Sequence, residues 1–171
     1  MTRLAEGIWL YPYRLTALGV NIGRNVTVIR LESGRLVIHS TAPFTEADIG
    51  EIRKLGEPGW LVEGMVDHDT FSGAGRKAFP EIPFLAPAGF QTRVDFPVGS
   101  LDAPPMEWLP ELEVIRIDGA PMMVENLLFL HRGHWWCATC CSISPSCHRC
   151  GRRSCSRWRW AGRRRRVFPS G

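Results

Sequence analysis

The first part of the chain contains no cysteine, and the last part contains no acidic residue. All 6 cysteines lie between Cys137 and Cys155, and all 17 acidic residues lie between Glu6 and Glu125. Residues 1–131 carry 11 lysines and arginines, whereas residues 132–171 carry 10. The net charge of +4 therefore describes neither part, and it gives no argument for a nucleic-acid partner of residues 1–131.

Long apolar runs are missing as well. No stretch approaches the roughly 20 apolar residues that a transmembrane helix needs. The segment Met1 to Leu10 contains Glu6 and lacks the apolar centre of a secretory signal. We therefore expect a cytoplasmic protein with no membrane partner. The composition, 44% hydrophobic and 22% charged, is that of an ordinary globular domain.

Short strands and helices are predicted to alternate along residues 1–131. Apolar and β-branched runs predict strands at 7–11, 25–31, 35–40, 60–62, 82–86, 112–117 and 124–130. Helices are predicted after Thr45, an N-cap followed by acidic residues, and over 71–79. We expect Trp9, Trp60 and Trp108 in the core, and mostly loop over 86–110. This alternation favours a layered α/β domain.

The tail, residues 132–171, allows three interpretations. Cys137-x-x-Cys140 and Cys147-x-x-Cys150 have the spacing of zinc knuckles, and arginines 163–166 would then contact nucleic acid. The second interpretation is a disordered tail that the gene encodes as such. The third is translation in the wrong reading frame, which the genetic code can test.

The shifted frame of residues 134–143 permits a strand-like sequence. Because tryptophan has a single codon and cysteine has few, the alternatives are narrow and include Leu-Val-Val-Arg-Asp-Leu-Leu-Phe-Asn. This sequence would form a buried strand beside 124–130 and end on a polar residue. We therefore favour the off-frame interpretation, consider nucleic-acid binding by zinc knuckles the lesser alternative, and expect a disordered tail.

Several segments of residues 1–131 match one known superfamily. They are the Gly7-Ile8-Trp9 start, the strands 25–31 and 36–40, Leu55-Gly56, Asp67-His68 with Phe71 and Gly73, Phe79-Pro80, 84–87, and Phe129-Leu130-His131. In these segments the chain resembles an uncharacterised branch of the metallo-β-lactamase superfamily. The resemblance implies a partial αββα sandwich over residues 1–131, with metal ligands on loops at one edge of its sheets.

The superfamily's metal motif is largely missing. In His-x-His-x-Asp-His, imidazoles and a carboxylate converge on one or two zinc ions and leave a position for activated water. Here Asp67-His68 matches only the last two letters, and we align the two earlier histidines with Gly64 and Val66. The aspartate that bridges metals in the superfamily occurs only in the alternative frame. The resemblance therefore implies a degenerate metal site.

Four side chains are candidates for the remaining chemistry. Asp67 and His68 are the candidate catalytic residues, and His68, Asp67, Asp69 and His39 are candidate ligands of a zinc ion. The structural alternative is that His39 and His68 point apart and bond to backbone groups. We expect the loop 65–70 to lie at the carboxyl ends of strands 36–40 and 60–62, with His39 facing His68.

Two functional hypotheses follow from this degenerate motif. The favoured one is a metallo-β-lactamase-fold protein that is not catalytically active as written. The alternative is a metal-dependent hydrolase acting on an unknown small-molecule substrate.

Overall fold

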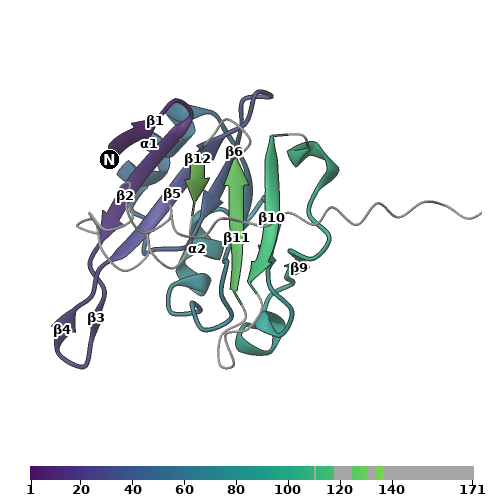
Figure 1. Ribbon diagram of the computed structural model, residues 1–171. Coiled ribbons are helices and arrows are strands. Elements are labelled where there is room, and N and C mark those ends of the chain that lie inside the picture. The colour runs from purple at the N-terminus through teal and green to yellow at the C-terminus, as the bar shows by residue number, and fades with distance from the viewer. Residues whose placement is uncertain (110, 118–124, 131–133, 137–171) are drawn as a thin grey trace, which may run out of the picture.

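The largest of three sheets organises the described part of the molecule. A computed structural model describes residues 1–109, 111–117, 125–130 and 134–136. Within them, seven strands pair in the order β1-β2-β5-β6-β7-β8-β9 (Figure 1). Neighbours from β1 to β6 are antiparallel, and those from β6 to β9 are parallel. The bounds are β1 Thr2–Ala5, β2 Ile8–Tyr13, β5 Arg24–Arg30, β6 Arg35–His39, β7 Glu57–Val62, β8 Phe84–Ala86 and β9 Gly99–Ser100.

A smaller antiparallel sheet and a few helices complete the described fold. The second sheet contains β10 (Leu112–Ile117), β11 (Glu125–Leu130) and β12 (His134–Trp136). The strands β3 (Thr16–Ala17) and β4 (Val20–Asn21) form a hairpin that projects from the body (Figure 1). The α-helices are α1 (Glu46–Leu55) and α2 (Ser72–Ala78), and the 3-10 helices are η1 (Phe90–Arg93) and η2 (Met106–Trp108).

The two faces of the large sheet are both covered. On one face, a cluster that includes Val28 of β5 and Ile38 of β6 packs with Ile52 of α1. On the other face, Val37 and its neighbours pack with Leu112 of the second sheet. Strands β5 and β6 are buried on both faces, and β5 buries the polar residues Arg24, Asn25 and Thr27 as well as apolar ones. The described part therefore has three layers, in the order helix, large sheet and second sheet.

Helix α1 begins where its capping residues predict. The Thr45 hydroxyl accepts a hydrogen bond from the Asp48 N–H at 3.2 Å, and the Asp48 carboxylate accepts one from the Thr45 N–H at 2.9 Å. This reciprocal pair satisfies helix N–H groups that have no partner within the helix. Gly56 follows the helix at a close approach, since a Cβ there would lie 2.3 Å from the Gly34 carbonyl oxygen.

Some predicted boundaries shift by a few residues. The helix predicted over 71–79 is α2, and residues 86–110, predicted to be mostly loop, also contain the short elements η1, β9 and η2. The strand predicted over 124–130 is β11, and it lies between β10 and β12. Strand β12 consists of three residues of the predicted tail, His134–Trp136, which pair with β11. Residues 137–171, with their reading-frame and zinc-knuckle interpretations, and His131 lie outside the described residues.

Candidate functional site

The candidate residues gather at the carboxyl edge of two parallel strands. His39 is the last residue of β6, and it pairs with Val62, the last residue of β7. Glu63 follows directly, and residues 64–71 then lead to α2. Since β6 and β7 are parallel, His39 and the loop after β7 emerge at the same edge of the sheet. That is where the sequence placed the loop 65–70.

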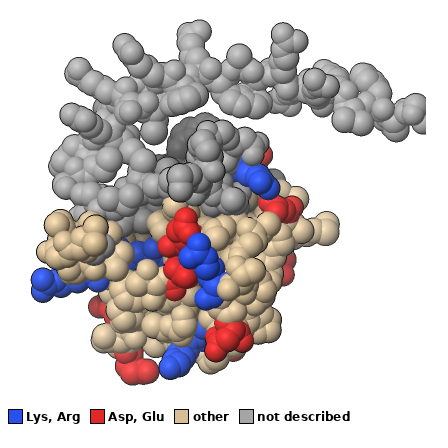
Figure 2. Space-filling model, turned by 90° about the horizontal axis from the view of Figure 1, so that it is seen from below, with Lys and Arg blue, Asp and Glu red and all other residues tan. Residues whose placement is uncertain are grey.

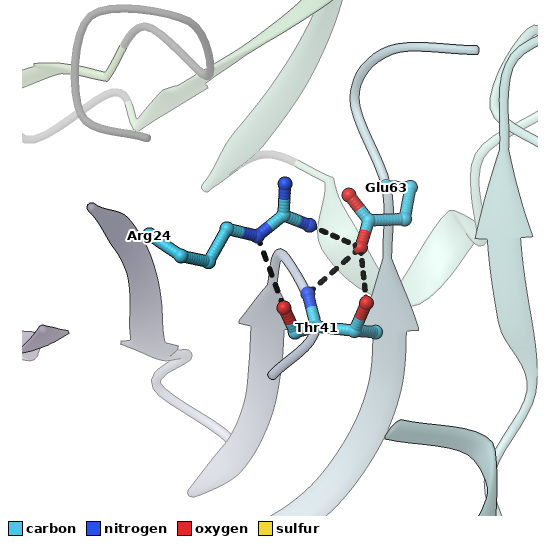
Figure 3. A network of polar contacts seen from close by, with 3 residues as sticks. All are labelled: Arg24, Thr41 and Glu63. Carbon is cyan, nitrogen blue, oxygen red and sulfur yellow. Dashed lines mark hydrogen bonds and ion pairs between the residues drawn. The ribbon is translucent and has the colours of Figure 1, made fainter. Parts of the chain in front are cut away.

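A buried ion pair occupies this edge. The side chains of Arg24 and Glu63 are 2% and 0% exposed, and Arg24 Nη2 donates to Glu63 Oε1 at 2.7 Å. Thr41 donates to the same oxygen through its backbone N–H at 2.7 Å and its hydroxyl at 2.5 Å. The Thr41 carbonyl accepts a bond of 3.0 Å from Arg24 Nε. Figure 3 shows the three residues meeting at this edge, where β5 begins and β6 and β7 end.

Opposing effects act on the pKa of the Glu63 carboxyl group. Burial raises this pKa, whereas the Arg24 guanidinium and the two Thr41 donors lower it. An oxygen that accepts three hydrogen bonds, one of them from a guanidinium, favours the ionised form. We therefore describe Arg24 and Glu63 as a salt-bridged ion pair. The other oxygen, Glu63 Oε2, is buried and has no partner among the described residues.

The two candidate histidines both have depressed pKa values. Burial, followed by the charges of Arg24 and His68, lowers the pKa of His39 to about 3. Burial and then Arg24 lower the pKa of His68 to about 4, against the opposing effect of Asp67 and Asp69. Both rings are therefore neutral at pH 7. His39 Nε2 is buried and has no partner among the described residues. That the two rings point into one shared site stays a prediction.

The two candidate carboxylates contact an arginine from η1. Arg93 Nη2 lies 2.5 Å from Asp67 Oδ1, and Arg93 Nη1 lies 3.8 Å from Asp69 Oδ2. An open pocket of about 400 Å³ is lined by Asp69 and Arg93 together with Thr92 and Phe96. On the described part of the face seen in Figure 2, acidic and basic side chains lie next to one another.

These surroundings do not fit a zinc centre of the superfamily's usual kind. Within residues 1–109, 111–117, 125–130 and 134–136, no three His, Cys, Asp or Glu side chains form a group able to hold a metal ion. Glu63 is paired with Arg24, and Asp67 is paired with Arg93. Guanidinium groups thus neutralise carboxylates in the positions where the motif would need ligands.

The Arg24–Glu63 ion pair was not predicted from the sequence, and the metal motif begins one residue earlier than predicted. Counting back from Asp67-His68 through His-x-His-x-Asp-His gives Glu63 and Met65 as the first and third positions, and not Gly64 and Val66. The signal that points to Glu63 is a charged residue directly after a buried apolar strand, because such a charge needs a partner. Nothing in the sequence identifies Arg24 as that partner.

Two comparisons of the sequence with known proteins give no match. No family model matches the chain, and no curated protein matches it in sequence. No helix in the described part of the chain is long and apolar enough to cross a membrane.

Three solved structures illustrate the match. The DIM-1 metallo-β-lactamase exposed to ceftazidime is 19% identical, with a TM-score of 0.57, covering 76% of this chain and 64% of that one. The FIM-1 enzyme from Pseudomonas aeruginosa in its mono-zinc form is 12% identical, with a TM-score of 0.51, covering 75% and 63%. A metallo-β-lactamase from Pontibacter korlensis is 12% identical, with a TM-score of 0.53, covering 77% and 66%. This chain thus matches less than two thirds of the length of each, and it has the metallo-β-lactamase fold.

Proposed function

We propose that this chain is a metallo-β-lactamase-fold protein with a degenerate metal site and no hydrolase activity in the form given. The observation that carries the proposal is the Arg24–Glu63 ion pair. The first position of the metal motif holds a carboxylate whose charge a buried guanidinium already neutralises. A zinc ion there would have to displace Arg24 or accept its repulsion.

The remaining letters of the motif support the same proposal. Met65, at its third position, is 6% exposed and offers only a thioether, which is a poor ligand for zinc. Asp67 is paired with Arg93 at the surface. The proposal extends to a cytoplasmic protein without membrane or nucleic-acid partners. It is supported by the excess of acidic over basic residues in 1–131 and by the mixture of both charges on the described part of the face in Figure 2.

Zinc content tests the proposal directly. The purified chain is dialysed against micromolar zinc and then against metal-free buffer, and bound zinc is measured by elemental analysis. We expect far less than one zinc per chain, and the same result for His68→Ala. Near-stoichiometric zinc in the parent chain that His68→Ala removes would overturn the proposal and favour a hydrolase.

A metal-dependent hydrolase of an unknown small molecule is the second candidate. One observation favours it: His39 Nε2 is buried and has no partner in the described part of the chain. A neutral imidazole is also the form that binds metal. The test uses a variant in which residues 134–142 are replaced by the alternative-frame sequence, which supplies the missing aspartate. Zinc uptake and hydrolysis that both depend on His68 would support this candidate.

A further inference from the structure

We propose that the guanidinium of Arg24 takes the place of a metal ion at the carboxyl edge of β6 and β7, and that its charge prevents metal binding there. The inference rests on the proposed function, because it explains why the site is degenerate. It goes further by naming one side chain as the cause. It therefore predicts that removing this cation uncovers a metal site.

Two bonds hold the guanidinium in a fixed position. Arg24 is the first residue of β5, and its side chain reaches past the end of β6 to Glu63, after β7 (Figure 3). Its Nε donates to the Thr41 carbonyl and its Nη2 donates to Glu63 Oε1. A planar guanidinium bound at two of its nitrogens has little freedom to move. The charge is thus a permanent part of this edge.

Two atoms at this edge that are of a type able to bind metal lack hydrogen-bond partners. Glu63 Oε2 and His39 Nε2 are both buried, and neither has a hydrogen-bond partner among the described residues. Buried polar atoms without partners are uncommon and call for a physical explanation. A carboxylate oxygen and a neutral imidazole nitrogen are both ordinary zinc ligands. The edge has therefore kept donors that suit a metal.

The charge of Arg24 opposes a second cation at these donors. Arg24 Nη2 lies 2.7 Å from Glu63 Oε1, so a metal ion held by the Glu63 carboxylate would lie close to the guanidinium. Two positive charges so close together repel each other, and burial of both side chains limits the screening of this repulsion. A metal ion at this carboxylate would therefore require the removal of Arg24.

The test compares variants with and without the cation. Arg24→Met alone leaves the Glu63 charge buried without its partner, which threatens folding. The pair to compare is therefore Glu63→His, which keeps Arg24, and Arg24→Met/Glu63→His, which has neither buried charge. Both carry an imidazole at the first position of the motif. Binding of Co(II) is followed by its visible absorption, and folding by circular dichroism.

We expect the double variant to bind Co(II) about 10- to 100-fold more tightly than Glu63→His, the range that groups around a metal site commonly control. Adding His39→Gln should remove this gain. Arg93→Met in the Glu63→His background is the matched control, since Arg93 is exposed and pairs with other carboxylates. It should give no gain that depends on His39.

Two results would overturn the inference. One is tight Co(II) binding by Glu63→His with Arg24 in place, and the other is a folded double variant without any gain. If the double variant does not fold, Arg24→Leu/Glu63→His is the second variant without either buried charge, and absence of a His39-dependent gain in Co(II) binding by it has the same meaning. Zinc in the parent chain would overturn the proposed function, whereas these results concern Arg24 alone.

Discussion

At the scale of single residues, the backbone at Ser40 determines how the ion pair is held. Ser40 has a φ of 71°, in the left-handed region that residues other than glycine occupy at a cost of about 1–3 kcal/mol. With this conformation at Ser40, the backbone changes direction between His39 and Thr41. It lets both backbone groups of Thr41 reach the ion pair, the N–H to Glu63 and the carbonyl to Arg24. Local backbone strain is thus coupled to a buried polar network.

His39 should make the stability of the protein depend on pH. Burial lowers its pKa from the ordinary 6.5 to about 3, so the folded state binds a proton less readily than the unfolded state. The stability that this difference provides is complete above pH 6.5 and is lost as the pH falls from 6.5 towards 3. In that window the contribution is up to about 1.4 kcal/mol per pH unit.

Urea unfolding between pH 7 and pH 4 measures this contribution. The free energy of unfolding of the parent chain should fall more steeply with decreasing pH than that of His39→Gln, whose side chain does not titrate. Carboxyl groups titrate in both proteins, so their effect cancels in the difference. Parallel pH profiles would contradict the prediction.

At the scale of elements, sequence predicted what local signals determine. The strands over 25–31 and 35–40 were predicted from continuous β-branched runs, and α1 from Thr45 and the acids that follow it. Strand β9 consists of two residues that only its pairing with β8 defines, so no local pattern reveals it. The same reason explains why β3 and β4 were missed.

Part of the candidate site was likewise predictable from the sequence, and part was not. The shared edge of His39 and the loop after β7 was predictable, because both follow strands that end at the same edge of the sheet. The partners of the acidic residues were not predictable, because Arg24 is 39 positions from Glu63 and Arg93 is 26 positions from Asp67. Which arginine reaches which carboxylate depends on the packing of the whole domain.

Helix α2 is linked to the site through one close contact. A Cβ on Gly75 would lie 2.5 Å from Thr41 Cγ2 and 2.7 Å from Thr41 Cβ, so the helix packs directly on the residue that binds Glu63. Gly75→Ala should therefore lower the free energy of unfolding by about 1–3 kcal/mol, as overpacking usually does. Chemical denaturation measures the change.

The same helix supplies the matched control. A Cβ on Gly73 would have no atom within 4 Å. Gly73→Ala should stabilise the protein by up to about 1 kcal/mol, because alanine favours helix more than glycine does. If both substitutions shift stability in the same direction, the contact with Thr41 is not what constrains α2.

At the scale of the whole molecule, stability depends on how the two sheets meet. Within the second sheet, β11 has neighbours on both sides. The face of the large sheet that includes Val37 and Trp60 packs on Trp108 of η2 and Leu112 of β10. Burial of this face, and not strand pairing alone, should determine whether the chain stays folded.

Trp108 is the residue on which this packing depends most. Its side chain is fully buried, and its ring meets that of Trp60 edge to face, with centroids 5.7 Å apart. Trp108→Ala removes this contact and leaves a cavity beside the second sheet, so it should cost about 3–5 kcal/mol. Met106, two positions earlier in the same short helix, is 86% exposed, and Met106→Ala should change stability by about 0.5 kcal/mol or less.

Thermal unfolding followed by circular dichroism, together with binding of a hydrophobic dye, distinguishes the two variants. Trp108→Ala should unfold at a much lower temperature and bind the dye, whereas Met106→Ala should behave like the parent chain. Equal behaviour of the two variants would mean that the sheets are held together without Trp108.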